Sequence, residues 1–101
     1  MAYEVIISGD VLKMLDSIVF YLENNWSKKI AKKFLINFYA KVDALVSNPA
    51  INPKSSKSKS TSIRKMLITK HNMLYYEVHD NTIELLQLFD TRQSPAKNKF
   101  E

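Results

Sequence analysis

Two helical periodicities, separated by only a few residues, are the feature that most limits how this chain can fold. The first apolar stripe consists of Val11, Leu15, Ile18 and Leu22. The second consists of Trp26, Ile30, Phe34, Phe38, Val42 and Leu45. Steps of three and four residues place each set on one face of an amphipathic helix. Because the link between them is so short, the two helices are predicted to form an antiparallel hairpin.

Capping residues set the predicted limits of the two helices. Asp10 is expected to cap the first helix, and Asn24-Asn25 to end it. Ser27 is a suitable N-cap for the second helix, and Asn48-Pro49 stops it because proline lacks the amide hydrogen. The aromatic residues at helical spacing are predicted to be core residues: Phe20, Trp26, Phe34 and Phe38.

Four β-prone segments surround the helices: residues 3–8, 62–69, 73–79 and 82–89. Asp80-Asn81 suits a two-residue hairpin, so the last three segments are predicted to form an antiparallel meander. Apolar residues on both faces of 62–69 favour an interior position for that strand. The predicted fold is α+β in the order β-α-α-β-β-β, with the helix hairpin on one face of a small, mostly antiparallel sheet. The edge that the first strand joins is left open.

Length and composition favour one soluble domain over residues 1–101. The chain has no cysteine, which excludes a disulfide scaffold and thiolate metal ligands. The N-terminus has no basic segment ahead of an apolar stretch, so no signal peptide is predicted. No apolar run approaches the ~20 residues of a membrane span, and a cytoplasmic protein without membrane contact is expected.

Positive charge is concentrated in one part of the chain. The net charge is +5, and no acidic residue lies between Asp43 and Glu77. Six of the 15 Lys and Arg residues lie there: Lys54, Lys57, Lys59, Arg64, Lys65 and Lys70. A concentrated basic patch would suit a polyanion or an acidic protein. The alternative is a solvated, lysine-rich loop at residues 50–61.

The usual enzyme motifs are missing. A single glycine excludes a dinucleotide-binding fingerprint and a phosphate-binding P-loop. His71 and His79 are the only histidines, with no clustered carboxylates evident beside them, so neither a metal site nor a cofactor is predicted. No nucleophile-elbow signature indicates a serine hydrolase.

Arg64 and the two adjacent tyrosines are the candidate contact residues of the predicted sheet. Alternation puts Arg64 on a sheet surface near tyrosines, where a guanidinium stacks and binds phosphate or carboxylate in a bidentate manner. The alternative is a partly buried arginine paired with Glu77 or Glu84. Because Tyr75 and Tyr76 are adjacent, one of them must point away from the core, where it is a candidate contact for a partner.

Several motifs together resemble toxins of the RelE/ParE superfamily, which belong to type II toxin–antitoxin and plasmid stabilisation systems. They are the strand with Arg64, the turn Lys70-His71-Asn72, the strand with Tyr75-Tyr76 and the ending Asp90-Thr91-Arg92-Gln93-Ser94-Pro95. The N-terminal half, with Trp26-Ser27 opening the second helix, is similar too. The resemblance covers nearly the whole chain and implies the same fold and a cognate antitoxin as partner.

The resemblance leaves two activities open. RelE-like members are metal-independent endoribonucleases that act on ribosome-bound mRNA, and Arg64, Arg92 and Lys57 match their catalytic cations. The C-terminal tyrosine of that branch is replaced by Phe100, and His71 is the remaining group for proton transfer. ParE-like members inhibit DNA gyrase, and this branch is favoured. A relative that only binds, without toxicity, is a third possibility. The expected binding residues are Lys54, Lys59, Lys65, Lys70, His71 and Tyr75.

Overall fold

The computed structural model describes residues 3–50, 52–54, 63–93, 97–98 and 100. Its elements are β1 (Glu4–Ile7), α1 (Gly9–Asn25), α2 (Lys28–Ser47), β2 (Ile63–Thr69), β3 (Asn72–Val78) and β4 (Thr82–Asp90). The predicted order of one strand, two helices and three strands is confirmed. Neither helix in the described part of the chain is long and apolar enough to cross a membrane.

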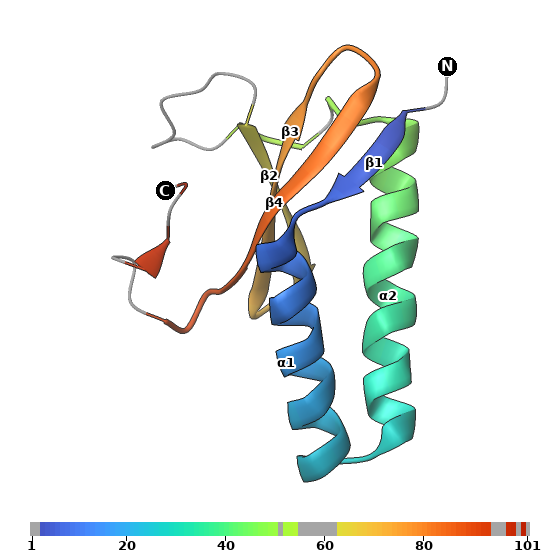
Figure 1. Cartoon of the computed structure of the whole chain (residues 1–101), viewed down its shortest axis with the longest axis vertical. Coiled ribbons are helices and arrows are strands. Elements are labelled where there is room, and N and C mark those ends of the chain that lie inside the picture. The colour runs from blue at the N-terminus through green and yellow to red at the C-terminus, as the bar shows by residue number, and fades with distance from the viewer. Residues whose placement is uncertain (1–2, 51, 55–62, 94–96, 99, 101) are drawn as a thin grey trace.

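The four strands form one mixed sheet in the order β1-β4-β3-β2, and the helix hairpin covers one of its faces (Figure 1). β1 pairs with β4 in parallel, whereas the β2–β3 and β3–β4 pairs are antiparallel. The α+β prediction of a helix hairpin on a mostly antiparallel sheet is therefore confirmed. The structure also places the first strand, which joins the edge formed by β4.

β2 is an edge strand, so the prediction of an interior position is wrong. Its apolar composition is explained by what covers its outer edge. Asn37 Nδ2 of α2 donates to the carbonyl of Ile68 at 3.0 Å, and Lys41 Nζ donates to that of Leu67 at 3.3 Å. Near the other end, the amide of Lys65 donates to the carbonyl of Pro53 at 3.0 Å. Backbone groups at three positions of this edge are thus bonded by other parts of the chain instead of a fifth strand.

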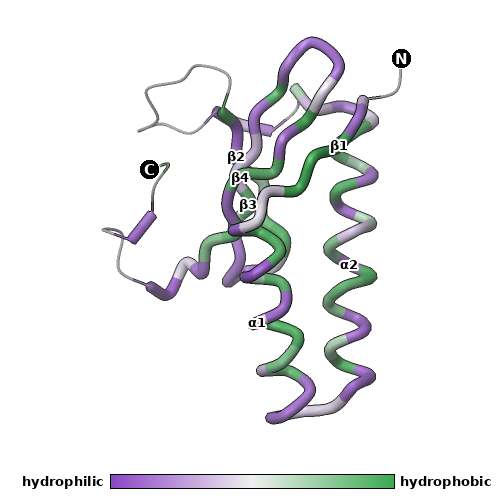
Figure 2. The backbone as a smooth tube through the Cα atoms, in the orientation of Figure 1, coloured by the Kyte–Doolittle hydropathy of each residue, from purple (hydrophilic) through white to green (hydrophobic). Residues whose placement is uncertain are grey.

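The main core lies between the sheet and the helices, where the apolar parts of the chain face one another (Figure 2). Its buried members are Val11, Leu15, Phe38, Val42, Leu45, Ile68, Leu74, Tyr76, Ile83, Leu85 and Leu88. Leu85 and Leu88 both reach this core because the β3–β4 register shifts between them. Tyr75 pairs with Gln87 and Tyr76 with Leu85, so Leu86 is an extra residue, and the bulge restores the inward direction at Leu88.

Ser8, and not Asp10, caps α1. The Ser8 hydroxyl accepts from the amide of Val11 at 3.3 Å and donates to the carbonyl of Leu86 at 3.1 Å. The second bond ties the helix start to the bulge in β4. Asp10 is the second residue of the helix itself and so lies past the cap position. At the other helix, the predicted cap is confirmed: the Ser27 hydroxyl accepts from the amide of Ile30 at 3.1 Å.

The outer face of the sheet carries a second apolar cluster of Ile63, Tyr75 and Phe89, with Phe100 packed against it. Tyr76 points into the main core and Tyr75 points to this outer face, as the alternation predicts. Tyr75 is nevertheless buried. Its ring stacks on Phe100 at a centroid distance of 5.9 Å, and Asn98 Nδ2 donates to its hydroxyl at 2.9 Å.

The tip of the helix hairpin extends past the sheet (Figure 1). Trp26 lies at this tip and is 70% exposed. Phe20 lies on the face of α1 opposite Ile18 and Leu22 and is 69% exposed, so the assignment of both residues to the core is wrong. Phe38, one turn beyond Phe34 toward the middle of α2, is fully buried, and Phe34 is half-buried. The helical stripe is real, but its first residues have no sheet beneath them to pack on.

Candidate functional site

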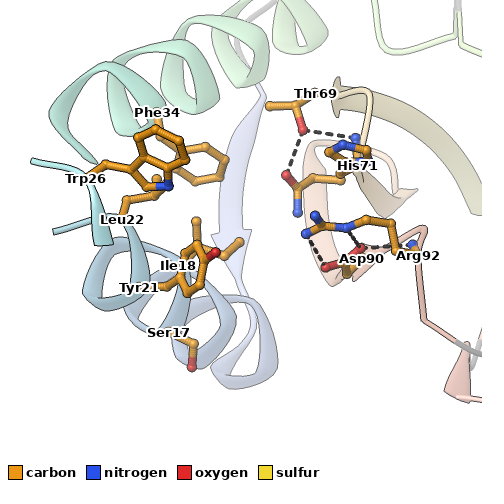
Figure 3. Close-up of a pocket in the computed structure, with 11 residues that line it drawn as sticks. Ser17, Ile18, Tyr21, Leu22, Trp26, Phe34, Thr69, His71, Asp90 and Arg92 are labelled. Atoms are coloured by element: carbon orange, nitrogen blue, oxygen red, sulfur yellow. Dashed lines mark hydrogen bonds and ion pairs between the residues drawn. The ribbon is translucent and has the colours of Figure 1, made fainter. Parts of the chain in front are cut away.

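An open groove of about 600 Å³ lies between the tip of the hairpin and the end of the sheet that carries the β2–β3 turn (Figure 3). Its helical wall is apolar and is formed by Ile18, Tyr21, Leu22, Trp26 and Phe34. Its sheet wall is polar and is formed by Thr69, His71, Asn72, Asp90 and Arg92. Ser17 also lines it. An apolar surface facing fixed polar groups is the usual composition of a site that binds and orients a partner group.

The polar wall is held in place by the turn between β2 and β3. Thr69 Oγ1 donates to Asn72 Oδ1 at 2.7 Å and accepts from the amide of His71 at 3.2 Å. The amide of Thr91 donates to the carbonyl of His71 at 2.9 Å, which joins the turn to the residue after β4. His71 is therefore held by bonds on both sides of its backbone, and its side chain is part of a preformed surface.

Arg92 lies on the same wall in a bidentate ion pair with Asp90 (Figure 3). Its Nε and Nη2 donate to the two carboxylate oxygens at 3.0 and 2.9 Å, and its backbone amide donates to Oδ1 at 2.9 Å. The hydrogen bonds from Arg92 hold the pKa of the Asp90 carboxyl below its ordinary value of 3.8. The carboxylate in turn raises the pKa of Arg92. Arg92 therefore lines the groove as part of a neutralised ion pair with Asp90 and not as an isolated cation.

Because the pKa of Asp90 is lowered in the folded chain, the stability of the protein should depend on pH through this residue. The carboxylate of Asp90 is protonated near pH 3.8 in the unfolded chain and only at a lower pH in the folded chain. The Asp90–Arg92 pair therefore stabilises the fold at pH values above 3.8. Asp90→Asn should therefore be less stable than the wild type at pH 7. The difference in the free energy of unfolding between the wild type and Asp90→Asn should decrease as the pH falls from 3.8 through the pKa of Asp90 in the folded chain. Urea unfolding at a series of pH values measures it. Asp16→Asn, which changes an exposed aspartate outside the groove, should show no such decrease.

Arg64 lies at the opposite end of β2 from the groove and has a structural role. Its Nη1 donates to the carbonyl of Asn52 at 2.7 Å, which fastens the segment that follows α2. The Tyr76 hydroxyl, directly across the strand pair, donates to the carbonyl of Pro49 at 2.8 Å. Burial raises the pKa of Tyr76, and this rise is opposed by Asn52 and Arg64. Arg64 is partly buried, as one interpretation predicted, but its partner is the backbone carbonyl of Asn52 and not Glu77 or Glu84.

Arg64→Ala should lower the free energy of unfolding by about 1–3 kcal/mol, because it removes a charge-assisted hydrogen bond from a partly buried carbonyl. Urea unfolding of the purified protein measures this. Lys70→Ala is the matched control, since Lys70 is an exposed cation in the turn at the other end of the same strand. Equal stability of the two variants would contradict the structural role of Arg64.

The remaining predicted residues do not gather at one place. Lys54 is exposed beside Arg64, with which it forms an isolated β-bridge. Lys65 lies across from Tyr75, on the outer side of the sheet, and Lys70 is exposed in the β2–β3 turn. Lys57 and Lys59 fall outside the described residues. The described cations of the basic segment thus occupy both ends and both faces of β2, and the expected single patch is not found among them.

Of the predicted site residues that the structure describes, the groove brings together His71 and Arg92. Sequence reasoning missed the aromatic wall, because it assigned Trp26 to the core. It also missed Asp90 as the partner of Arg92, although the spacing of two residues just after a strand was visible. On the outer face, the side chains of Glu77, His79 and Glu84 lie close together. The prediction that no carboxylates cluster beside the histidines is therefore wrong for His79.

Comparisons with known proteins agree with this architecture. The chromosomal ParDE toxin–antitoxin system from P. aeruginosa is similar, at 13% identity and a TM-score of 0.72, over 88% of this chain and 96% of that one. The YoeB dimer from Staphylococcus aureus is similar at 18% identity and a TM-score of 0.63, over 88% and 97%. The YoeB–YefM heterotetramer from the same organism follows at 19% identity and a TM-score of 0.58, over 88% and 97%.

At these identities the structural likeness concerns the fold. A comparison with curated protein sequences finds no match. Residues 5–95, however, match the sequence model of the family described as the ParE toxin of the type II toxin–antitoxin system parDE. The chain therefore belongs to the ParE toxin family of type II toxin–antitoxin systems.

Proposed function

We propose that this chain is a non-catalytic toxin that inhibits DNA gyrase and is neutralised by a cognate antitoxin bound in the groove. The observation that carries the proposal is the separation of the predicted catalytic cations. Arg64 fastens a loop at one end of β2, whereas Arg92 is paired with Asp90 at the other end. Arg64 is five residues from the Thr69 end of β2, roughly 17 Å along the strand. Each guanidinium is held by a partner at its own end, so the two are not arranged to stabilise one phosphate.

The groove has the features of a protein-binding surface. Trp26 and Tyr21 are 70% and 57% exposed, and Ile30 next to them is 40% exposed. Aromatic residues exposed together beside a cleft are typical of surfaces that bind a partner, where tryptophan and tyrosine contribute most of the affinity. An antitoxin segment would cover this apolar wall, and its polar groups would meet the sheet wall.

The charge at the hairpin tip indicates the chemistry of that segment. The first six residues of α2 include four exposed lysines: Lys28, Lys29, Lys32 and Lys33. The first turn has no acidic residue. Cations at a helix N-terminus oppose the helix dipole, so this arrangement costs stability in the free protein. An acidic, apolar segment would offset that cost while it covers Trp26.

The test is a supercoiling assay with purified gyrase. Addition of the chain should inhibit supercoiling and increase the number of broken DNA molecules, because a bound inhibitor that stalls the enzyme traps cleaved DNA. A cognate antitoxin, to be sought in the neighbouring reading frames, should reverse the inhibition at an equimolar amount. An unchanged rate of supercoiling at saturating toxin would reject the proposal.

Ribosome-dependent cleavage of mRNA is the second candidate, and one observation favours it. His71 and Arg92 line the same groove, which brings an imidazole and the guanidinium of the Arg92–Asp90 pair to one surface. Cleavage of a ribosome-bound message that is lost in His71→Gln would support this activity. If the message stays intact in the presence of the wild-type chain, the ribonuclease activity is rejected.

A further inference from the structure

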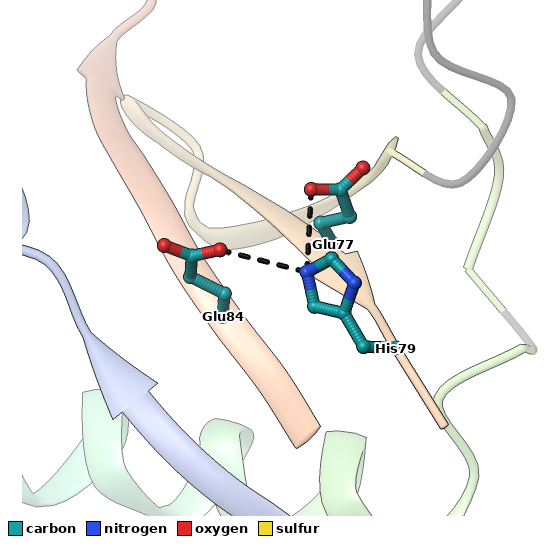
Figure 4. A group of neighbouring side chains, drawn as sticks. All are labelled: Glu77, His79 and Glu84. Carbon is teal, nitrogen blue, oxygen red and sulfur yellow. Dashed lines mark ion pairs between the residues drawn. The ribbon is translucent and has the colours of Figure 1, made fainter. Parts of the chain in front are cut away.

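The outer end of the β3–β4 hairpin carries three potential metal ligands on one surface: Glu77, His79 and Glu84 (Figure 4). Glu77 and His79 are two residues apart at the end of β3, and Glu84 lies on β4. The amide of His79 donates to the carbonyl of Thr82 at 2.8 Å, which closes the hairpin between them. The three side chains therefore lie on neighbouring strands of one closed hairpin.

The two glutamates are direct cross-strand partners in the β3–β4 register. Two like charges placed opposite each other on neighbouring strands destabilise a sheet. In this hairpin the imidazole of His79 lies between the two carboxylates (Figure 4). A cation bound between Glu77 and Glu84 would lessen this repulsion.

The distances fit a metal ion. His79 Nε2 is 3.4 Å from Glu77 Oε1 and 3.5 Å from Glu84 Oε1. The ligand atoms of all three residues lie within 4.8 Å of one another. Zinc binds imidazole nitrogen and carboxylate oxygen at about 2.0–2.2 Å, so two ligands of a tetrahedral site are about 3.3–3.5 Å apart. An ion between these atoms would need little movement of the backbone.

We infer that Glu77, His79 and Glu84 form a binding site for one divalent transition-metal ion of the zinc class. The mixture of one imidazole and two carboxylates suits zinc, whereas magnesium prefers oxygen ligands alone and an octahedral shell. The three protein ligands leave the fourth tetrahedral position to water. The side chains of Glu77, His79 and Glu84 are 22%, 49% and 38% exposed, so the ion has a direct path from solvent.

The bound ion joins the Glu77–Glu84 pair to His79, the residue that follows β3, and neutralises the opposed carboxylates. Because the site exists only in the folded chain, binding stabilises the fold by mass action. The site lies at the hairpin end opposite the β2–β3 turn, on the outer face of the sheet. It is therefore independent of the groove and of the proposed inhibition of gyrase.

The test uses the untagged full chain after treatment with a chelator, titrated with Zn²⁺ by calorimetry and followed by thermal unfolding. One Zn²⁺ should bind per chain, and saturating Zn²⁺ should raise the Tm by about 5 °C or more. His79→Gln and Glu84→Gln should each weaken binding by at least about 10-fold and remove most of the shift. Mg²⁺ at the same concentration should leave the Tm unchanged.

His71→Gln is the matched control, because it removes the only other histidine of the chain and lies at the opposite end of β3. This variant should bind Zn²⁺ as tightly as the wild type. The inference is overturned if the wild type shows no Zn²⁺-dependent shift, which would leave the cluster as an ion pair between His79 and the carboxylates. It is also overturned if His79→Gln binds as the wild type does.

Discussion

Replacement of Phe38 by alanine should lower the free energy of unfolding by about 3–5 kcal/mol. Phe38 is fully buried in the middle of α2, where it joins the helix layer to the sheet. Removal of its ring takes away apolar contacts and leaves a cavity that the surrounding side chains fill only in part. In a domain of about 100 residues, such a loss is a large fraction of the total stability.

Phe20→Ala is the matched control for this variant. Phe20 is the same residue type on the neighbouring helix, but it is 69% exposed, so its truncation should change the free energy of unfolding by less than about 0.5 kcal/mol. Chemical denaturation of the two variants under identical conditions compares them directly. A loss at Phe38 below about 1 kcal/mol, or equal losses at the two positions, would contradict the assignment of the core.

The contrast between Trp26 and Phe38, the first an exposed and the second a buried member of the same apolar stripe, shows how far the sequence predicts this fold. Periodicity identified both helices and the face that each buries, because spacing along a helix is a local property. It did not predict how far the hairpin extends beyond the sheet, since that depends on the relative lengths of two layers that meet only after folding. The same holds for β2, whose edge is covered by side chains of α2 and by residues 52–54, and which therefore has the composition of an interior strand.

The candidate sites show the same difference between local sequence patterns, which could be predicted, and contacts that form only on folding. His71 and Arg92 were predicted from short motifs, and the fold brings them to one groove because the β2–β3 turn lies beside the end of β4. The role of Arg64 depended on a loop that no periodicity describes. The cluster of Glu77, His79 and Glu84, in contrast, was accessible from the sequence. A two-residue turn at Asp80-Asn81 already implies that residues 77 and 84 are opposite each other, and this pairing is what the structure has.

Replacement of Trp26 by alanine should weaken binding of the antitoxin by about 30-fold or more, which corresponds to about 2 kcal/mol for loss of a central tryptophan contact. Trp26 is 70% exposed on the apolar wall of the groove. The hydrogen bond that its backbone amide donates to the carbonyl of Leu22 is kept when the side chain is replaced by alanine. The stability of the free toxin should therefore change little. Calorimetric titration with the cognate antitoxin measures the affinity.

Ile36→Ala is the control for a general loss of apolar surface, because Ile36 is 60% exposed on α2 but does not line the groove. An equal or larger loss of affinity in Ile36→Ala would place the antitoxin on a different face of the hairpin. The same two variants in the supercoiling assay separate the two partners. If Trp26→Ala loses both antitoxin binding and gyrase inhibition, the antitoxin neutralises the toxin by covering the surface that contacts gyrase. If inhibition persists, the two proteins bind at separate surfaces, and neutralisation requires a change in the toxin itself.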